Sequence, residues 1–444
     1  MPRSRWNSPP PQLNEPCAPS SSHRRSRRRS PRNLPRAGSR TWDSWMPRPP
    51  PFPTSTPYWP VAAPQADMPP VADWDLVVVG AGPAGSAAAI SALRERPDAR
   101  VLVLDRAPMG RDKVCGDGIA PHAVAELERL GVSAGKPAEK LSGVRLVAPN
   151  GRSVGALPTV TGYVIPRATF DERLLKAALS AGAEFEVQRV TSVEQDGASV
   201  VLNDRWRAST VIGADGSNSS VRRLMGQPAN RGRALAVAIR GYSPTPTGAP
   251  RELTIRWDSQ RAGGLCYAWA FPTANGTTNV GYGMSSGAPD HSRARLEQRA
   301  RELLPDYNFD GVPLTGHTLP LTVSRPRPAV GRVLLVGDAA SLINPFTGEG
   351  IYAAIVSGAL AGAAAINAPD APGPAYARAL AARFHRQHRQ TGALYRIIDS
   401  PTVLNTVIRA AGRDARLFDR LIDVGLGDSV FTLGDLARFA RHAF

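Results

Sequence analysis

The chain has 444 residues, of which 42% are hydrophobic and 20% charged, so it is long enough to bury the cores of two or three modules. Its net charge of +17 is uneven, because residues 1–70 hold eleven arginines and only three acidic residues. This stretch is rich in proline and has no apolar periodicity, which predicts a disordered basic extension. Such clusters also bind RNA or anionic membranes, and a true start at Met68 would remove this one, so we assign it no function and expect no nucleic-acid partner.

The cysteines and the longest apolar run argue against a disulfide-rich protein, a cysteine-bound metal and a membrane-spanning helix. Cys17, Cys115 and Cys266 are too few and too scattered for a disulfide framework or a metal site. Residues 351–366 form an uncharged run shorter than the roughly 20 residues needed to cross a bilayer, which predicts a buried helix. The N-terminal region has no apolar segment typical of a secretory signal, so we expect a cytoplasmic protein with no bound metal.

The first predicted elements form a dinucleotide-binding turn. Residues 75–79 are a β-branched run that predicts a strand, and a helix is expected to begin at Ala84. Between them, Gly80 permits a tight turn and Gly82 lets the backbone approach a pyrophosphate. Gly85 lets the helix pack on the strand, and the helix N-terminus favours the phosphate charge.

A second apolar strand is predicted at residues 101–104. It ends in Asp105, twenty residues after Gly85, where a carboxylate would bind the ribose hydroxyls of a dinucleotide, and Arg106 follows it. NAD and FAD share this opening, so the unit alone does not distinguish the two cofactors.

An aromatic strand is predicted at residues 267–272. Alternation along a strand places Tyr267, Trp269 and Phe271 on one face, which would give a flat apolar wall for a long apolar ligand. Gly281 and Gly283 follow on the next segment and would remove side chains where a cofactor or a ligand must pass. The alternative is a strand whose aromatic side chains fill the core.

A further strand is predicted at residues 332–336, followed by Asp338 and by a proline- and glycine-rich loop before the apolar helix. Here the sequence resembles the FAD-dependent oxidoreductases built like aromatic hydroxylases, and segments 166–171 and 211–217 share the resemblance. The resemblance implies FAD, with Asp338 on the ribityl chain and the loop beside the isoalloxazine. The cofactor-binding residues that it implies in these segments are Arg167, Asp215, Asp338, Pro345, Gly348, Gly350 and Ile351.

Within that superfamily, residues 112–119 and the aromatic strand with its two glycines are similar to the geranylgeranyl reductase family, over about residues 73–396. This resemblance implies that the loop with Cys115, Gly116 and Gly118 lies beside the flavin. It also implies a reductase that saturates the double bonds of a polyprenyl quinone tail, a geranylgeranyl group or a prenyl lipid. Hydride transfer to an unactivated alkene also needs a proton, for which Cys115, Tyr267 or an ordered water are candidates.

The expected fold class is α/β, with an α+β second domain. We expect a Rossmann-like FAD-binding domain, an interleaved and mainly antiparallel substrate sheet, and C-terminal helices. The FAD-binding domain is expected in three parts, at residues 73–165, 166–230 and 326–375. The substrate sheet is expected at residues 231–325, between the second and third of these parts, and the C-terminal helices at residues 376–444. The arginines of the last region predict a solvated face or, alternatively, a peripheral contact with the inner face of the cell membrane.

The sequence is compatible with more than one electron donor and more than one reaction. No second dinucleotide fingerprint appears in the sequence, so NADPH, ferredoxin or another donor would supply the electrons. The alanine- and arginine-rich composition is typical of a high-GC bacterium, which favours the tail of menaquinone or a related polyprenyl tail as the substrate. The rival reaction is that of an FAD-dependent monooxygenase acting on an apolar or aromatic substrate, and the rival from another class is a non-catalytic electron-transfer or RNA-associated protein.

Overall fold

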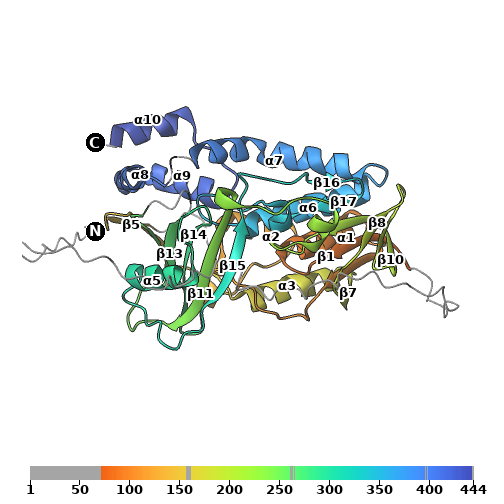
Figure 1. Cartoon of the computed structure of the whole chain (residues 1–444), viewed down its shortest axis with the longest axis horizontal. Coiled ribbons are helices and arrows are strands. Elements are labelled where there is room, and N and C mark those ends of the chain that lie inside the picture. Colours follow the sequence, from red (N-terminus) through yellow and green to blue (C-terminus); the bar gives the residue numbers. More distant parts are fainter. Residues whose placement is uncertain are drawn as a thin grey trace, which may run out of the picture. The chain divides into compact units, whose positions relative to one another are not determined.

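The computed structural model describes residues 72–156, 162–260, 264, 266–395, 397 and 399–442 (Figure 1). Our expectations for residues 1–70 and for Cys17 lie outside these residues. The described part contains an eight-stranded sheet, a seven-stranded sheet and a small pair of strands. The fold class is therefore the expected mixture of α and β elements.

The eight-stranded sheet has a parallel centre, in which β1 pairs with β2 and β10, β2 with β7, and β10 with β17. The buried residues of β1 and β2 read as continuous apolar runs because helices or loops cover both faces of a parallel sheet. Its strands are β1 (Ala72–Val79), β2 (Val101–Asp105), β7 (Glu184–Val187), β8 (Val193–Gln195), β9 (Val200–Leu202), β10 (Trp206–Gly213), β16 (Ala329–Val330) and β17 (Val333–Leu335).

Helix α1 (Pro83–Glu95) packs directly against α6 (Ile351–Asn367), and Figure 1 shows both beside β1. Two glycines one turn apart allow this contact, because a Cβ atom at Gly358 would lie 2.9 Å from the carbonyl carbon of Ala84. A Cβ at Gly362 would lie equally close to the carbonyl carbon of Ala88. The prediction of a buried helix at 351–366 is confirmed, and none of the described helices is long and apolar enough to cross a membrane.

This contact gives a direct test. We predict that Gly362→Ala lowers the free energy of unfolding by about 1–3 kcal/mol, because the added methyl group meets the backbone of α1. Gly392→Ala, in α7 (Pro372–Leu394), is the control, because no atom lies within 4 Å of the added Cβ. That variant should gain about 0.5–1 kcal/mol from helix propensity. Thermal unfolding of both variants measures the difference, and equal stabilities would contradict the close packing of α1 and α6.

The seven-stranded sheet is antiparallel except where β12 pairs with β4. The structure places residues 143–156 in this sheet as β4 and β5, although the sequence grouped them with the FAD-binding segment 73–165. The sequence of these short strands carries no signal for which sheet they join, since the partner of β4 in the sheet, β12, is more than 100 residues away. The strands are β4 (Gly143–Val147), β5 (Ser153–Ala156), β11 (Leu235–Pro244), β12 (Glu252–Trp257), β13 (Cys266–Pro272), β14 (Thr277–Ser285) and β15 (Thr315–Pro320).

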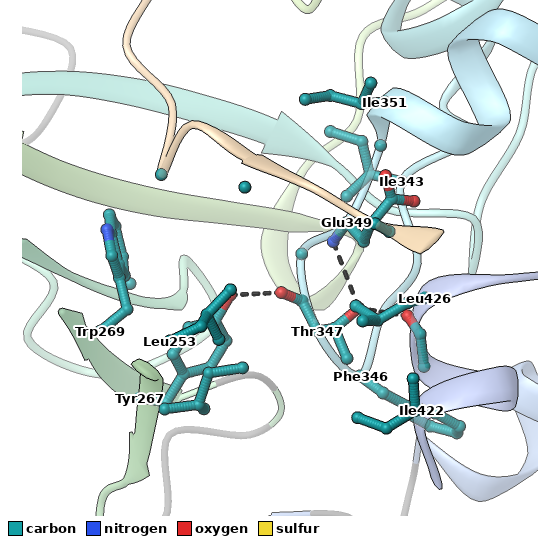
Figure 2. Close-up of a pocket in the computed structure, with 18 of the residues that line it drawn as sticks. Leu253, Tyr267, Trp269, Ile343, Phe346, Thr347, Glu349, Ile351, Ile422 and Leu426 are labelled. Carbon is teal, nitrogen blue, oxygen red and sulfur yellow. Dashed lines mark hydrogen bonds between the residues drawn. The ribbon is translucent and has the colours of Figure 1, made fainter. Parts of the chain in front are cut away.

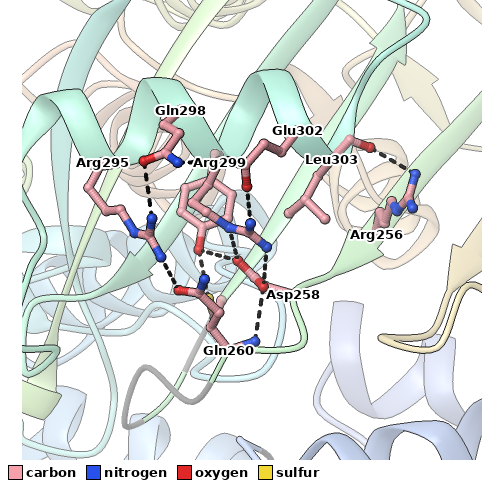
Figure 3. Close-up of polar contacts among 10 residues, drawn as sticks. Arg256, Asp258, Gln260, Arg295, Gln298, Arg299, Glu302 and Leu303 are labelled. Carbon is pink, nitrogen blue, oxygen red and sulfur yellow. Dashed lines mark hydrogen bonds and ion pairs between the residues drawn. The ribbon is translucent and has the colours of Figure 1, made fainter. Parts of the chain in front are cut away.

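Helix α5 (Arg293–Leu303) covers one face of this sheet, and a buried ion pair fixes it there. Figure 3 shows Arg299 of α5 reaching the carboxylate of Asp258, with an Nε to Oδ2 distance of 2.8 Å. The hydroxyl of Tyr282 donates to the same carboxylate at 2.9 Å. Cys266 is buried on this face, as its opposite direction to Tyr267 predicts, so the other face of β13 is left for a site.

The remaining elements connect the two sheets, pack against α1 and α6, as α3 and α2 do, or lie against the seven-stranded sheet. Helix α8 contacts β5, α9 and α10, so the C-terminal helices lie against the end of that sheet. The elements are α2 (Pro121–Arg129), α3 (Arg167–Ser180), α4 (Ser220–Leu224), α8 (Pro401–Arg413), α9 (Ala415–Leu426), α10 (Leu433–His442), the strand pair β3 (Gly118–Ile119) and β6 (Tyr163–Val164), and the 3₁₀ turns η2 (Pro137–Glu139), η3 (Gly232–Ala234) and η4 (Gly337–Ala340).

Candidate active site

A cavity of about 770 Å³ lies between the starts of α1 and α6 with η4, the face of β13 that α5 leaves uncovered, and the C-terminal helices. Its walls are mostly apolar, and Figure 2 shows Leu253, Ile343, Phe346, Ile422 and Leu426 among them. The predicted site residues that it brings together are Cys115, Gly116, Gly118, Arg167, Tyr267, Trp269, Phe271, Gly283, Asp338, Gly348, Gly350 and Ile351.

The glycine turn lies between this cavity and a second, smaller hollow, because Pro83 lines the cavity and Ala81 lines the hollow. Gly80 has a φ of 114°, and a Cβ there would lie 2.6 Å from the carbonyl carbon of Ala214. At Gly82 the added Cβ would have only the side-chain ends of Arg111, Arg167 and Asp171 near 4 Å, so its backbone borders an open cradle. Gly85 packs against Gly80, and Ala84 is buried in the first turn of α1.

Asp105 lies at the edge of the smaller hollow, at the carboxyl end of β2. Its Oδ2 accepts from the amide of Ala81 at 2.8 Å and its Oδ1 from the amide of Ala107 at 3.0 Å. These bonds hold the carboxylate beside the glycine turn, where a ribose would lie. The neighbouring Arg106 is exposed and lines neither hollow.

Arg167, at the start of α3, supplies a positive charge beside the cradle. It is only 2% exposed and forms a double hydrogen bond with Asp171, at 2.7 Å from Nε and 2.8 Å from Nη2. Burial alone would lower the pKa of Arg167, but the adjacent Asp171 carboxylate raises it, so the guanidinium stays charged. A fixed cation near free helix N–H groups suits a pyrophosphate.

Asp338 lies in η4 on the cavity wall, where the Nζ of Lys113 contacts its Oδ2 at 2.8 Å. Burial favours its neutral form, yet the lysine lowers the pKa of Asp338, so the carboxylate stays charged. Burial and the charge of Lys113 lower the pKa of His317 to about 4, which leaves this imidazole neutral, and its Nε2 lies 3.0 Å from the hydroxyl of Ser217. Neither Lys113 nor His317 was predicted from the sequence as a site residue.

Asp215, Pro345 and Gly281 do not line either hollow. The Oδ2 of Asp215 accepts from the amides of Ser220 and Val221 at 2.6 and 3.1 Å, so it supports the start of α4. Its other oxygen is buried and has no hydrogen-bond partner within the described residues. Pro345 is buried in the loop behind Gly348.

The aromatic wall is formed by the face of β13 that α5 leaves uncovered. Tyr267, Trp269 and Phe271 all line the cavity, with ring centroids 6.0 and 6.4 Å apart between successive rings. Gly281 pairs with Trp269 on the adjacent strand, and the indole lies over it: a Cβ at Gly281 would be 2.6 Å from Cη2 of Trp269. The space at Gly281 therefore accommodates Trp269, while Gly283 faces the cavity.

A polar chain joins this wall to the loop that contains Cys115. The indole nitrogen of Trp269 donates to Oδ1 of Asn279 at 2.9 Å, and the Asn279 amide donates to the Cys115 carbonyl and to Asp117, both at 2.8 Å. Tyr242 donates to Asp117 at 2.5 Å, and burial raises the pKa of this acid to about 6. Sequence reasoning missed Asn279, although it alternates with Gly281 and Gly283 along β14.

The two candidate proton donors face the same cavity. Cys115 is half-buried on its wall. The hydroxyl of Tyr267 donates to the carbonyl oxygen of Thr347, as Figure 2 shows, and burial raises its pKa above the ordinary value for tyrosine.

These residues fit an FAD molecule. The open backbone at Gly82 and the charged Arg167 can hold the pyrophosphate, Asp105 the adenosine ribose, and Asp338 the ribityl hydroxyls. The N-terminus of α6 begins at Ile351 on the cavity wall, where its dipole favours negative charge on a reduced flavin ring. The fold and the site define an FAD-binding oxidoreductase.

The comparisons with known proteins agree. Residues 73–362 match the FAD binding domain family. A menaquinone reductase of Mycolicibacterium smegmatis is 35% identical over 309 residues, which is 65% of this chain and 75% of that protein. A digeranylgeranylglycerophospholipid reductase of Methanopyrus kandleri is 33% identical over 67% of this chain and 78% of its own length. A geranylgeranyl diphosphate reductase of Rhodobacter capsulatus is 31% identical over 73% of this chain and 82% of its length.

Among solved structures, a geranylgeranyl bacteriochlorophyll reductase-like protein of Thermoplasma acidophilum has the same fold, with a TM-score of 0.68 and 24% identity over 83% of this chain and 96% of that one. The chain belongs to the geranylgeranyl reductase family of FAD-dependent oxidoreductases. The family resemblance inferred from the sequence is thereby confirmed.

The place of Trp269 over Gly281 gives a second test. We predict that Gly281→Ala lowers stability by about 1–3 kcal/mol, because the new methyl group meets the indole and the backbone of Ile239. Gly283→Ala is the matched control on the same strand, since its nearest neighbour would be the Cβ of Ala238 at 3.3 Å. Thermal unfolding compares the two variants, and an equally small effect at both positions would contradict the packing described for Trp269.

Proposed function

We propose that the chain reduces carbon–carbon double bonds in a polyprenyl chain, and that its substrate is the isoprenoid tail of menaquinone. The observation that carries this proposal is the long apolar cavity that runs from Asp338 and the start of α6, past the aromatic wall, to the C-terminal helices. An extended hydrocarbon fits walls that are mostly apolar. Relatives named menaquinone reductase support the choice of this isoprenoid over a geranylgeranyl group.

The protein's contribution is to hold the chain, exclude water and supply a proton. Bound FAD, once reduced, supplies hydride to the alkene. The apolar walls keep the reacting carbons dry, so that positive charge developing on the alkene is not captured by water. The two side chains that the sequence offers as candidate proton donors, Cys115 and Tyr267, both line the cavity.

The described residues contain one dinucleotide turn, which the FAD would occupy, so we propose that a separate donor reduces the flavin. A nicotinamide such as NADPH and a small redox protein such as ferredoxin both have the required chemistry. The monooxygenase alternative uses the same fold, and several structural neighbours are halogenases or hydroxylases, but each of these is at most 21% identical and supports the fold alone.

The reaction is tested with purified, FAD-loaded protein that is reduced without oxygen and mixed with menaquinone in detergent micelles. The expected result is reoxidation of the flavin together with a product whose isoprenoid tail is heavier by two hydrogen atoms for each reduced bond, a change in the tail that reduction of the quinone ring does not produce. Flavin that reacts only after oxygen is admitted, with an oxygenated product, would favour the monooxygenase.

The shape of the cavity predicts a chain-length effect. Val407 lines the cavity from α8, among the walls that the C-terminal helices contribute. Val407→Trp should fill that end of the cavity and lower kcat/KM for a long polyprenyl substrate by about tenfold for each 1.4 kcal/mol of lost binding, while a short-chain analogue reacts as before. Val407→Leu is the control with little added volume. Equal losses for long and short chains, with unchanged FAD content, would contradict this path.

We also propose that the protein takes its substrate from a membrane surface. Exposed apolar side chains gather near the C-terminal end of the cavity, where Ile397 is 51%, Leu433 85% and Leu436 48% exposed. Arg413 and Arg441 are exposed on the same group of helices. Apolar side chains next to cations are typical of a surface that contacts anionic lipid.

This contact can be measured by sedimentation with vesicles that contain anionic phospholipid. Leu433→Asp should weaken vesicle binding about tenfold, because a buried leucine contributes roughly 1.5–3 kcal/mol. Leu224→Asp is the control, since this leucine is 41% exposed on α4 and does not line the cavity. Wild-type protein that does not sediment with vesicles at low salt would contradict the proposed contact.

A further inference from the structure

One acidic side chain on the cavity wall has no role in the mechanism described so far. Glu349 precedes α6 in the loop that follows Phe346, and Figure 2 shows it among Ile343, Ile351 and Leu426. Its backbone is fixed on both sides, because its amide donates to the hydroxyl of Thr347 at 3.3 Å and its carbonyl accepts from the Asn344 amide at 2.8 Å. The side chain is thus held at the junction of the cavity and the helix.

The surroundings of Glu349 favour a carboxyl group that keeps its proton. Burial among apolar side chains raises its pKa to about 8, and the nearby Asp338 carboxylate acts in the same direction. The Tyr352 amide donates to Oε1 at 2.7 Å and favours the charged form, but this contribution is the smaller one. At neutral pH most molecules therefore have a protonated Glu349 on the cavity wall.

Three other titratable groups of the cavity are less suited to donate a proton at neutral pH. The Lys113 ammonium is paired with Asp338, whose own pKa is lowered, and His317 is neutral. Tyr267 would leave a buried phenolate that had lost its bond to the Thr347 carbonyl. The titratable and charged residues that line the cavity with Glu349 are Lys113, Cys115, Lys140, Arg167, Arg240, Tyr267, His317 and Asp338.

We infer that Glu349 is the general acid of the reduction, an inference that rests on the proposed function above. Its carboxyl proton is transferred to one alkene carbon while the hydride supplied by the reduced cofactor adds to the other. The π bond breaks, two C–H bonds form, and both electrons of the second bond come from the hydride. Glu349 is left as a carboxylate beside the α6 N-terminus, where two backbone amides stabilise it until it takes a proton from water.

The test uses the FAD-loaded protein, reduced beforehand and mixed with the polyprenyl substrate in a single turnover. Glu349→Gln keeps an oxygen that can accept from Tyr352 but has no acidic proton, so flavin reoxidation by substrate should slow by about 100-fold or more. FAD affinity and flavin reduction by dithionite should stay within about twofold of wild type. Glu128→Gln, the same change on the exposed face of α2, is the matched control and should react at the wild-type rate.

Two further readouts keep the inference falsifiable if Glu349→Gln folds poorly. The wild-type single-turnover rate should be constant below about pH 7 and fall as the pH rises through the pKa of Glu349, because only the protonated acid donates. Because the pKa of Glu349 is higher in the folded protein than in the unfolded chain, the wild-type protein should lose stability as the pH rises from about 4.5 to 8. The permanently neutral amide of the Glu349→Gln variant would avoid this loss. The melting temperature of Glu349→Gln minus that of wild type should accordingly increase over this range.

The outcomes separate the two proposals. Wild-type protein that reduces no isoprenoid substrate would contradict the proposed function. Wild-type turnover together with an unimpaired Glu349→Gln variant, or a wild-type rate that is flat from about pH 6 to 9.5, would overturn the role of Glu349 alone.

Discussion

The site depends on the contact between the Cys115 loop and strand β13, because this contact joins the cofactor-binding half of the protein to the substrate sheet. A Cβ at Gly116 would lie 2.9 Å from the ring of Phe271 and 3.3 Å from the indole nitrogen of Trp269. Asn279 fastens the same loop by its bonds to Trp269 and to the Cys115 carbonyl. On the other side of the loop, Lys113 pairs with Asp338.

The apolar character of the cavity determines its electrostatics. Low polarity penalises charge, so it favours the neutral forms of Glu349, His317 and Tyr267, while paired groups such as Arg167 and Asp338 stay ionised. The charged Arg167 and Asp338 therefore lie where a pyrophosphate and a ribityl chain would bind, and the neutral Tyr267 lies on the aromatic wall. One fold can in this way hold a polar cofactor and an apolar substrate side by side.

Local patterns in the sequence were sufficient to predict the parts of the site that depend on neighbouring residues. The glycine turn between β1 and α1, Asp105 at the end of β2 and the alternation of Tyr267, Trp269 and Phe271 follow from strand and turn geometry. The buried helix α6 followed from a run without charges.

Contacts between distant segments were not predictable in this way. Lys113 and Asp338 are 225 residues apart, and Asn279 and Cys115 are 164 apart, so no periodicity relates them. The same holds for β4 and β5, whose sheet is decided by β12. The prediction for Gly281 was also incomplete. Its lack of a side chain was expected to leave space for a cofactor or a ligand, but the indole of its cross-strand partner, Trp269, takes up this space. The role that we propose for Glu349 depends on its place among apolar side chains from distant segments, which its sequence context does not reveal.

The central claim is that the cavity holds an isoprenoid chain beside the flavin. The most direct measurement is a crystal structure of the protein with FAD and a saturated polyprenyl analogue that cannot react. The account predicts electron density for the chain along Tyr267, Trp269 and Phe271, with its far end among α8, α9 and α10 and its near end beside Glu349 and the flavin ring. A chain bound outside the cavity, or a flavin that fills the cavity and leaves no space along the aromatic wall, would contradict it.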